Sequence, residues 1–511
     1  MAVDNHGSNN LLPNEVIVKI QRHHSGVRRH ANIGRLLALV AITASASTVA
    51  RAEDQPPAPI VKFDVMAMGE PSPALRYRLL PPFQDLTPGN AAIVYTKIAI
   101  EFGSGQSNAA YEEYNKVADW MDLPADQLPR AEVEEVLRMH QRRLAEADRA
   151  ARMESCDWQL PVRGDEPWAV LLPEAQGMRQ VARLLVLRIR LEILDGKHDA
   201  AIHSLQTGFA MARHVAEQPT LVSGLVGMAI ANLMMSEVAE FIRSPAAPNL
   251  YWALTTLPQP LVSLRLGMEQ EQCWIDFAFP KLRDFDTAQY SADEWREQLV
   301  HVAAVSKNLL DDHPEQSVWP PEVLATAIAL RAYPRAKSLM IVAGHPAEEV
   351  EKLPIAQVVL WGMMTDYRSV RDDVFKWYYV SQWERPAAQG TTDLLKSAEK
   401  GFEGYPFVWL IGAAQSAAWA EVRIERMVAA HTAVEALRIH ASKHGHKLPA
   451  ALKNVKEVPV PHDPSTGQPF AYSLSGTTGK LTSEAFNGKS PEHFGLHYEI
   501  KIIPFRASSP K

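Results

Sequence analysis

Apolar residues recur every three or four positions over most of this chain, which is the pattern of amphipathic helices. Val181, Leu184 and Leu185 share one helical face, and this run ends near Asp195-Gly196, a common C-terminal signal. A second helix is predicted from Asp199. Its apolar face is formed by Ala201, Leu205, Phe209 and Ala212. The two segments together predict a helical hairpin turning at 196–199.

Similar periodicity predicts most of the remaining secondary structure. Further helices are expected at 132–152, 259–277, 295–310, 321–332, 355–361, 367–379 and 405–442. Prolines and clusters of turn residues separate them. Strand-like alternation is nearly absent before position 455. The pattern therefore predicts a mainly α protein, an irregular array of helical hairpins over 91–425.

One helical segment, 221–235, is uncharged and contains Gly224 and Gly227. It could be a membrane helix with a small-residue packing face. It could also be a central helix that is apolar on all sides. The run is shorter than the ~20 residues that span a bilayer, and Glu237 and Glu240 follow at once. We therefore expect a buried helix and no membrane span in the mature chain.

The pattern changes after position 442. A stripe of Ala430, Val434, Leu437 and Ala441 predicts the end of a long helix that stops at Gly445. Two alternating runs follow. They are Phe470, Tyr472 and Leu474, and then Tyr498, Ile500 and Ile502. We expect a C-terminal α/β module at 426–506, with a long helix and a small antiparallel sheet whose Phe470–Tyr472 face packs on the helix at 434–437.

The N-terminal region has the features of an export signal. Arg28, Arg29 and Arg35 precede an uncharged run from Leu36 to Ala50, and Ala50-Arg51-Ala52 matches a signal peptidase site. Arg28-Arg29 resembles a twin-arginine signal, but His30-Ala31-Asn32 stands where a bulky apolar pair is usual. Residues 1–52 are therefore predicted to be a signal peptide, and an uncleaved anchor is the alternative. A proline-rich extended lead-in is expected at 53–90.

Composition narrows the possible functions. The chain has a formal net charge of −7 and no basic run after the signal, which argues against nucleic-acid binding. An apolar content of 47% suits a packed core. The only cysteines are Cys156 and Cys273. Outside the cytoplasm they could form a disulfide, or they could be two separate buried thiols.

Three resemblances follow from short motifs. GKHDAAI, from Gly196, resembles the turn of a tetratricopeptide hairpin, although no repeat is evident. The ending is similar to the helix-to-hairpin region of type II secretion major pseudopilins. Matching positions are Gly445, Pro449, Asp463, Pro464, Gly467, Pro469 and Phe470. Pseudopilins carry this region near the start of a short chain, behind an apolar stalk that is absent here, so pilus assembly is not implied.

The third resemblance covers most of the mature chain. The triplet Cys156-Asp157-Trp158, the run LVSGLVGMAI after Pro219 and the C-terminal region together resemble a family of exported planctomycete proteins. This resemblance implies export and brings no activity with it.

Motifs of known chemistry are few. HExxH and Gly-x-Ser-x-Gly are absent, and Gly488-Lys489-Ser490 lacks the first glycine of a phosphate-binding loop. His440 and His444 are one helical turn apart and could share a metal, with His446 and His462-Asp463 nearby. A solvated, frayed helix end is the expected alternative, and Asp463 is expected to cap a turn.

Two further clusters of charged residues could form a functional site. Glu269, Glu271 and Asp276 surround Cys273-Trp274, and paired carboxylates could hydrolyse a sugar bond. Glu269 and Glu271 diverge on a helix, so an acidic solvent face is expected instead. The second cluster is Arg76, Tyr77 and Arg78, which could bind an anion or lie on an extended surface segment.

No catalytic, cofactor-binding or metal residue is assigned from this sequence. The first functional hypothesis is an exported binding or scaffold protein that uses a helical surface on a protein or cell-envelope partner. The second is an extracytoplasmic hydrolase built from dispersed carboxylates and histidines. A cleft joining carboxylates of raised pKa would favour the hydrolase. An aromatic groove would favour binding, and it would be lined by Trp252, Trp274, Trp295 and Trp319.

Overall fold

A computed structural model describes residues 57–103, 108–163, 170, 172–310, 319–384, 411–485 and 491–504. The signal region and the 488–490 motif lie outside these residues. The elements of the first half are β1 (Ile60–Met66), β2 (Thr87–Asn90), α3 (Ala91–Gly103), α4 (Asn108–Met121), α5 (Arg130–Met139), α6 (Gln141–Ala150), β3 (Met153–Ser155), α7 (Pro173–Leu194), α8 (His198–Ala216) and α9 (Leu221–Arg243).

The second half is also mainly helical until the final strands. It contains α10 (Tyr251–Thr255), α11 (Arg265–Ala278), α12 (Ala292–Leu310), α13 (Pro321–Val342), α14 (Ala347–Val350), α15 (Ile355–Phe375), α17 (Ile411–Lys443), β4 (Ala471–Ser475), β5 (Thr478–Ser483), α18 (Pro491–Phe494) and β6 (Leu496–Ile503). The predicted class, mainly α with a small C-terminal α/β module, is confirmed.

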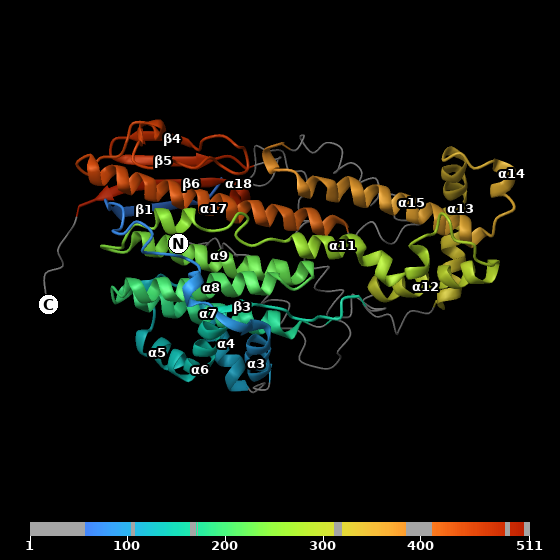
Figure 1. Ribbon diagram of the computed structural model, residues 1–511, viewed down its shortest axis with the longest axis horizontal. Coiled ribbons are helices and arrows are strands. Elements are labelled where there is room, and N and C mark those ends of the chain that lie inside the picture. Colours follow the sequence, from blue (N-terminus) through green and yellow to red (C-terminus); the bar gives the residue numbers. More distant parts are fainter. Residues whose placement is uncertain are drawn as a thin grey trace, which may run out of the picture.

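The centre of the molecule is a stack of α7, α8 and α9, with α3 and α6 packed on its outer side (Figure 1). The predicted hairpin is present, since α7 ends at Leu194 and α8 begins at His198, with Gly196 in the left-handed region at φ 68°. The helices approach closely because Gly227 of α9 lies against α8. A Cβ there would be 2.5 Å from the Ala212 carbonyl oxygen.

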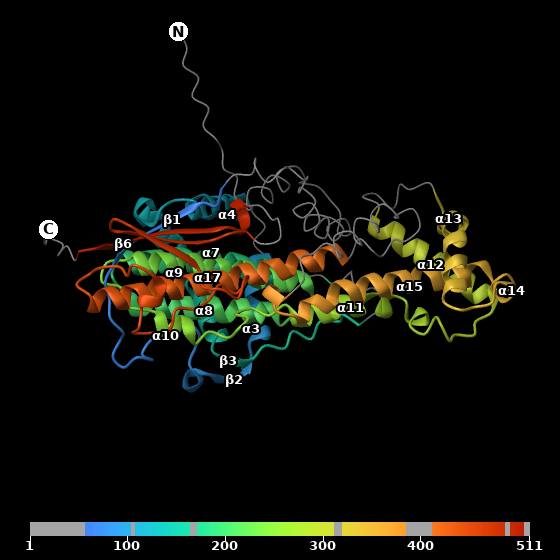
Figure 2. The ribbon, with the colours of Figure 1, turned by 90° about the horizontal axis from the view of Figure 1, so that it is seen from above.

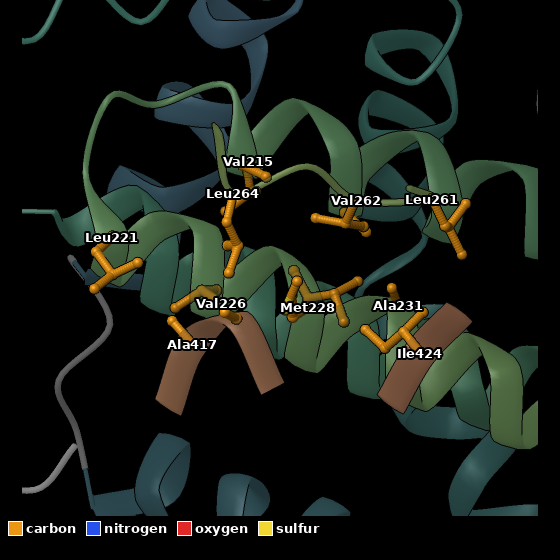
Figure 3. Packing of buried hydrophobic residues seen from close by; sticks show 14 of the residues in the cluster. Val215, Leu221, Val226, Met228, Ala231, Leu261, Val262, Leu264, Ala417 and Ile424 are labelled. Atoms are coloured by element: carbon orange, nitrogen blue, oxygen red, sulfur yellow. The ribbon is translucent and has the colours of Figure 1, made fainter. Parts of the chain in front are cut away.

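Helix α9 is the one helix among the described residues that is long and apolar enough to cross a membrane, and 67% of its apolar window is buried inside the protein. Apolar side chains cover it from several directions, including Leu264 of the segment before α11 and Ile424 of α17 (Figure 3). The expectation of a buried central helix agrees with this packing.

Helices α12 to α15 form the end of the molecule farthest from the sheet (Figure 2). Two predicted boundaries are wrong here. Helix α13 continues through Pro334 because only the Leu330 carbonyl loses its partner, and Leu330 is 77% exposed, so water can replace it. Helix α15 is continuous over the predicted break. Its Gly362 lies against α13, where a Cβ would be 2.5 Å from that of Ala336.

Two other predicted helices are shorter than expected. The 132–152 segment is divided at His140, which ends α5 and precedes α6. The His140 ring is buried between Phe102 and Glu113, and its Nε2 lies 2.5 Å from Glu113 Oε1. The 259–277 helix begins only at Arg265, after a non-helical segment that contains Pro258 and Pro260.

The C-terminal sheet has the strand order β1-β6-β5-β4 and covers α17 (Figure 1). Strands β4, β5 and β6 are antiparallel, as predicted. Strand β1 is the exception, because it pairs in parallel with β6, from Ile60 opposite His497 to Met66 opposite Ile503. The lead-in was expected to be only extended, although residues 60–66 alternate in burial like a strand.

Helix α17 meets the sheet through an aromatic cluster. Phe63 of β1 and Tyr498 of β6 have ring centroids 4.9 Å apart, and His431 of α17 stacks on Tyr498. Burial lowers the pKa of His431 to about 3, so its ring is neutral. The predicted helix end is confirmed, since α17 stops at Lys443 before Gly445.

The two cysteines do not form a disulfide. Cys156 is buried, and Cys273 is exposed on α11. Burial raises the pKa of the Cys156 thiol, which makes it unreactive.

Candidate functional site

A groove of about 470 Å³ lies between the N-terminal lead-in and α8. Its lining residues are Leu75, Arg76, Tyr77, Arg78, Pro82, Gln84, Asp85, Asp199, Ile202, His203 and Gln206. Arg76, Tyr77 and Arg78, the candidate anion-binding residues of the sequence, therefore lie together in one groove. We call this set of residues the lead-in groove.

The groove carries both signs of charge. Arg76 lies over the Tyr77 ring, with 5.1 Å between the guanidinium carbon and the ring centroid. Its Nη2 is 3.4 Å from Asp199 Oδ2 at an exposed position. Gln206 Nε2 donates to the Arg78 carbonyl oxygen and so holds the lead-in against α8. A purely anionic ligand would therefore meet Asp85 and Asp199 as well as the arginines.

Behind the groove, Arg152 fixes the tautomer of His203. Arg152 Nη2 donates to His203 Nδ1 over 2.9 Å, so the imidazole proton is on Nε2. Burial and the Arg152 charge lower the pKa of His203, which keeps it neutral. Arg152 is held in turn by Thr207, whose hydroxyl donates to Asp148. The groove thus offers a fixed neutral imidazole as a hydrogen-bond donor.

Carboxylates with strongly raised pKa values lie elsewhere. Burial raises the pKa of Glu237, Glu271 and Glu425 to about 7 in each case. Glu237 accepts from Arg190, Glu271 from the Leu221 amide and Glu425 from the Leu261 amide. None of the three lines the lead-in groove. Each holds a helix or segment in place, as Glu271 does at the first residue of α9.

The acidic cluster around Cys273-Trp274 is dispersed, as its spacing predicted, but it is not a solvent face. Only Glu269 is on the surface, paired with Arg265 at 2.8 Å. Glu271 is turned toward α9, and Asp276 lies 3.7 Å from both Arg368 and Arg371 of α15. The expectation of a solvent face is wrong because α11 packs against both α9 and α15, which the local sequence pattern does not show.

The histidines at the end of α17 are not a frayed, solvated pair. The His440 side chain is 7% exposed and its Nδ1 is 3.1 Å from Glu457 Oε2. His444 is half-exposed and stacks on His440, with ring centroids 3.9 Å apart. Its Nδ1 is 3.4 Å from Glu457 Oε1. No sequence pattern indicates Glu457 as a partner of these histidines, because it lies in an irregular segment of the chain.

The remaining histidines of that region take no part in the cluster. His446 is exposed, and His462 Nδ1 is 3.2 Å from the Gly467 carbonyl oxygen. Asp463 caps the turn as expected, because its Oδ1 accepts from the Ser465 amide at 2.8 Å. Arg426 of α17 also donates to Asp463, at 3.2 Å, and anchors the turn to the helix.

The four tryptophans proposed as a groove lining differ widely in burial. Trp295 is fully buried, Trp274 is buried at 9% exposure, and Trp319 is 64% exposed. Trp252 donates from Nε1 to Glu70 at 2.9 Å. None lines the lead-in groove, so the aromatic-groove expectation is not met there.

The chain matches no protein-family model, no curated protein and no solved structure.

Proposed function

We propose that this chain is a non-catalytic binding or scaffold protein that acts outside the cytoplasm and receives a polar segment of a protein or envelope partner in the lead-in groove. The observation that carries the proposal is the separation of the groove from the carboxylates of raised pKa. Hydrolysis by a carboxylate pair needs one group that stays protonated near neutral pH beside a second ionised one. Glu237, Glu271 and Glu425 have raised pKa values, but they are engaged in helix and segment contacts.

The groove itself suits an uncharged or zwitterionic polar segment. Arg76 and Arg78 supply donors, Asp85 and Asp199 supply acceptors, and His203 supplies a neutral N–H. A peptide backbone or a sugar presents donors and acceptors in this mixture. Because Arg76 and Asp199 are exposed, their ion pair is weak and can be exchanged for contacts with a partner.

Site-specific photo-crosslinking tests this proposal. A photoreactive residue at Gln84, which is exposed in the groove, should yield discrete adducts in the producing cell's envelope fraction. The same residue at exposed Glu349, on α14 at the other end of the molecule, is the matched control. Arg76→Ala should reduce the Gln84 adducts several-fold.

Equal adducts from both positions would contradict the proposal. So would turnover of a glycan, ester or peptide substrate by purified protein that Arg76→Ala abolishes, and that result would establish the hydrolase alternative.

A further inference from the structure

The end of α17 and the segment that follows it bring together two imidazoles and one carboxylate. We propose that His440, His444 and Glu457 bind a divalent transition-metal ion, with zinc the best fit. Among the described residues, this is the one group of three or more such side chains whose ligand atoms lie close enough, all within 4.8 Å of one another.

The distances fit a single ion. Glu457 directs one oxygen at each ring, Oε2 at 3.1 Å from His440 Nδ1 and Oε1 at 3.4 Å from His444 Nδ1. Tetrahedral zinc with ligands at ~2.0–2.1 Å places neighbouring ligand atoms about 3.4 Å apart. The rings are nearly parallel, at 13°, with their centroids 3.9 Å apart, and each Nδ1 atom lies beside one oxygen of the Glu457 carboxylate. An imidazole binds a metal in the plane of its ring, so the two stacked rings cannot both point at one ion as they stand, and exposed His444 must turn out of the stack when an ion binds.

The three proposed ligands differ in how deeply they are buried. The side chains of His440 and Glu457 are 7% and 9% exposed, whereas that of His444 is 50% exposed. An ion can therefore enter past His444 and be held from within by the other two. Two imidazoles and one carboxylate leave a fourth position for water, and this donor set suits zinc, cobalt or nickel better than magnesium or calcium.

Protons occupy the same positions when no ion is bound. His444 Nδ1 is also 2.9 Å from the His440 carbonyl oxygen, and Glu457 Oε2 accepts from the Lys456 amide at 3.0 Å. A metal would displace the proton on each Nδ1 and leave the Lys456 contact intact.

The ion would join two parts of the chain. His440 lies in the last turn of α17, His444 follows directly after the helix, and Glu457 belongs to the segment that leads into the sheet. Binding would stabilise the folded state by RT ln(1 + [M]/Kd) and would hold this segment against the helix.

Equilibrium dialysis of the chelator-treated full chain, prepared without a polyhistidine tag, measures zinc binding. His444→Ala and Glu457→Gln should each lose one bound equivalent or weaken its Kd at least tenfold. His446→Ala, an exposed histidine two residues from His444, is the matched control and should bind as the parent does. His6, His23, His24 and His30 are present in every variant, so their background cancels.

A second readout locates the ion. Zinc should slow hydrogen exchange of amides around 440–458 in the parent and in His446→Ala, but not in His444→Ala. Cobalt should give the visible absorption of a four-coordinate site in the same two proteins. Because His444 is exposed, His444→Ala leaves the fold intact, and circular dichroism checks this. Equal zinc binding by parent, His444→Ala and Glu457→Gln would overturn the proposal, as would no zinc-dependent protection at 440–458.

Discussion

Phe470 begins the first of the two alternating runs that predict the C-terminal sheet. It is 4% exposed and belongs to the continuous core. Removing a buried aromatic ring leaves a cavity, and such changes cost about 3–5 kcal/mol. We expect Phe470→Ala to lower the free energy of unfolding by about 3 kcal/mol in chemical denaturation. Leu474→Ala, at 36% exposure, is the control and should cost much less.

The contact between His440 and Glu457 changes the expected effect of replacing this histidine. As part of a frayed helix end, its replacement by alanine would cost little. The structure instead places the ring at 7% exposure against Glu457. We therefore expect a larger loss of stability than a frayed helix end would predict. His440→Ala should destabilise the protein by about 1–3 kcal/mol, since it removes the buried side chain that pairs with the Glu457 carboxylate.

Glu425 gives a pH-dependent prediction. Burial and the nearby Glu421 charge raise its pKa from 4.5 to about 7, so the folded state binds this proton more tightly than the unfolded chain. The contribution of this group to stability therefore falls as the pH rises from about 4.5 to about 7, and is constant above. Glu425→Gln keeps an acceptor for the Leu261 amide and cannot ionise.

Denaturation of this variant at pH 5 and pH 8 measures the effect. Glu425→Gln should match the parent at pH 5 and exceed its stability at pH 8, by on the order of 2 kcal/mol. Glu132→Gln, at a surface position with a side chain 60% exposed, should show no such difference between the two pH values. A gain for Glu425→Gln that is equal at both values would contradict the ionisation account.

Elements are joined in this protein by buried ion pairs. Arg438 and Glu435 of α17 are both fully buried and 2.9 Å apart. Arg438 also donates to the carbonyl oxygens of Met66 at the end of β1 and of Ala247 before α10. Glu435 accepts from the Leu250 amide at the start of α10. One pair thus holds β1, α10 and α17 together.

Removing one partner of the Arg438–Glu435 pair should destabilise the protein more than replacing both. Arg438→Met leaves a buried carboxylate unpaired and should cost about 3–5 kcal/mol. Adding Glu435→Gln removes that charge and keeps an acceptor for Leu250. The double variant should recover about 1–3 kcal/mol relative to Arg438→Met, as measured by a double-mutant cycle. Strict additivity of the two single effects would show that the residues do not act as a pair.

The periodicity of apolar residues predicts which segments are helical, but it often misplaces the ends of the helices. The α7–α8 hairpin and the stop at Gly445 follow from local signals that the structure uses. The helix ends predicted just before Pro334 and Gly362 are wrong. Pro334 is tolerated where water replaces one lost hydrogen bond, and Gly362 allows two helices to touch. Both depend on surroundings that no local window contains.

At the scale of the molecule, the lead-in and the C-terminal module are one structure. Phe63 and Val65 of β1 are fully buried beneath the sheet formed mainly by residues after 470. A chain lacking residues 1–66 should lose hydrogen-exchange protection along β6, because β6 then becomes an open edge. A chain lacking residues 1–56 keeps β1 and is the control. Unchanged protection of β6 in the shorter chain would show that the sheet does not need β1.

The candidate sites were only partly accessible from the sequence. The Arg76–Arg78 segment was recognised as chemically distinct, but its partners Asp199, His203 and Gln206 come from a helix more than a hundred residues later. Glu457 likewise joins His440 only through the return of the chain after α17. Such groupings depend on tertiary packing, so spacing along the chain does not reveal them.

The pairing of β1 with β6 also sets an order of events during synthesis. Strand β1 leaves the ribosome long before its neighbour β6, because most of the described chain lies between them. Through nearly all of translation, Phe63 and Val65 lack the surface that buries them, and such unpaired apolar strands are prone to misassociation. Nascent chains stalled before residue 496 should therefore remain open to protease near β1, and protection should arrive abruptly once residue 503 has cleared the exit tunnel.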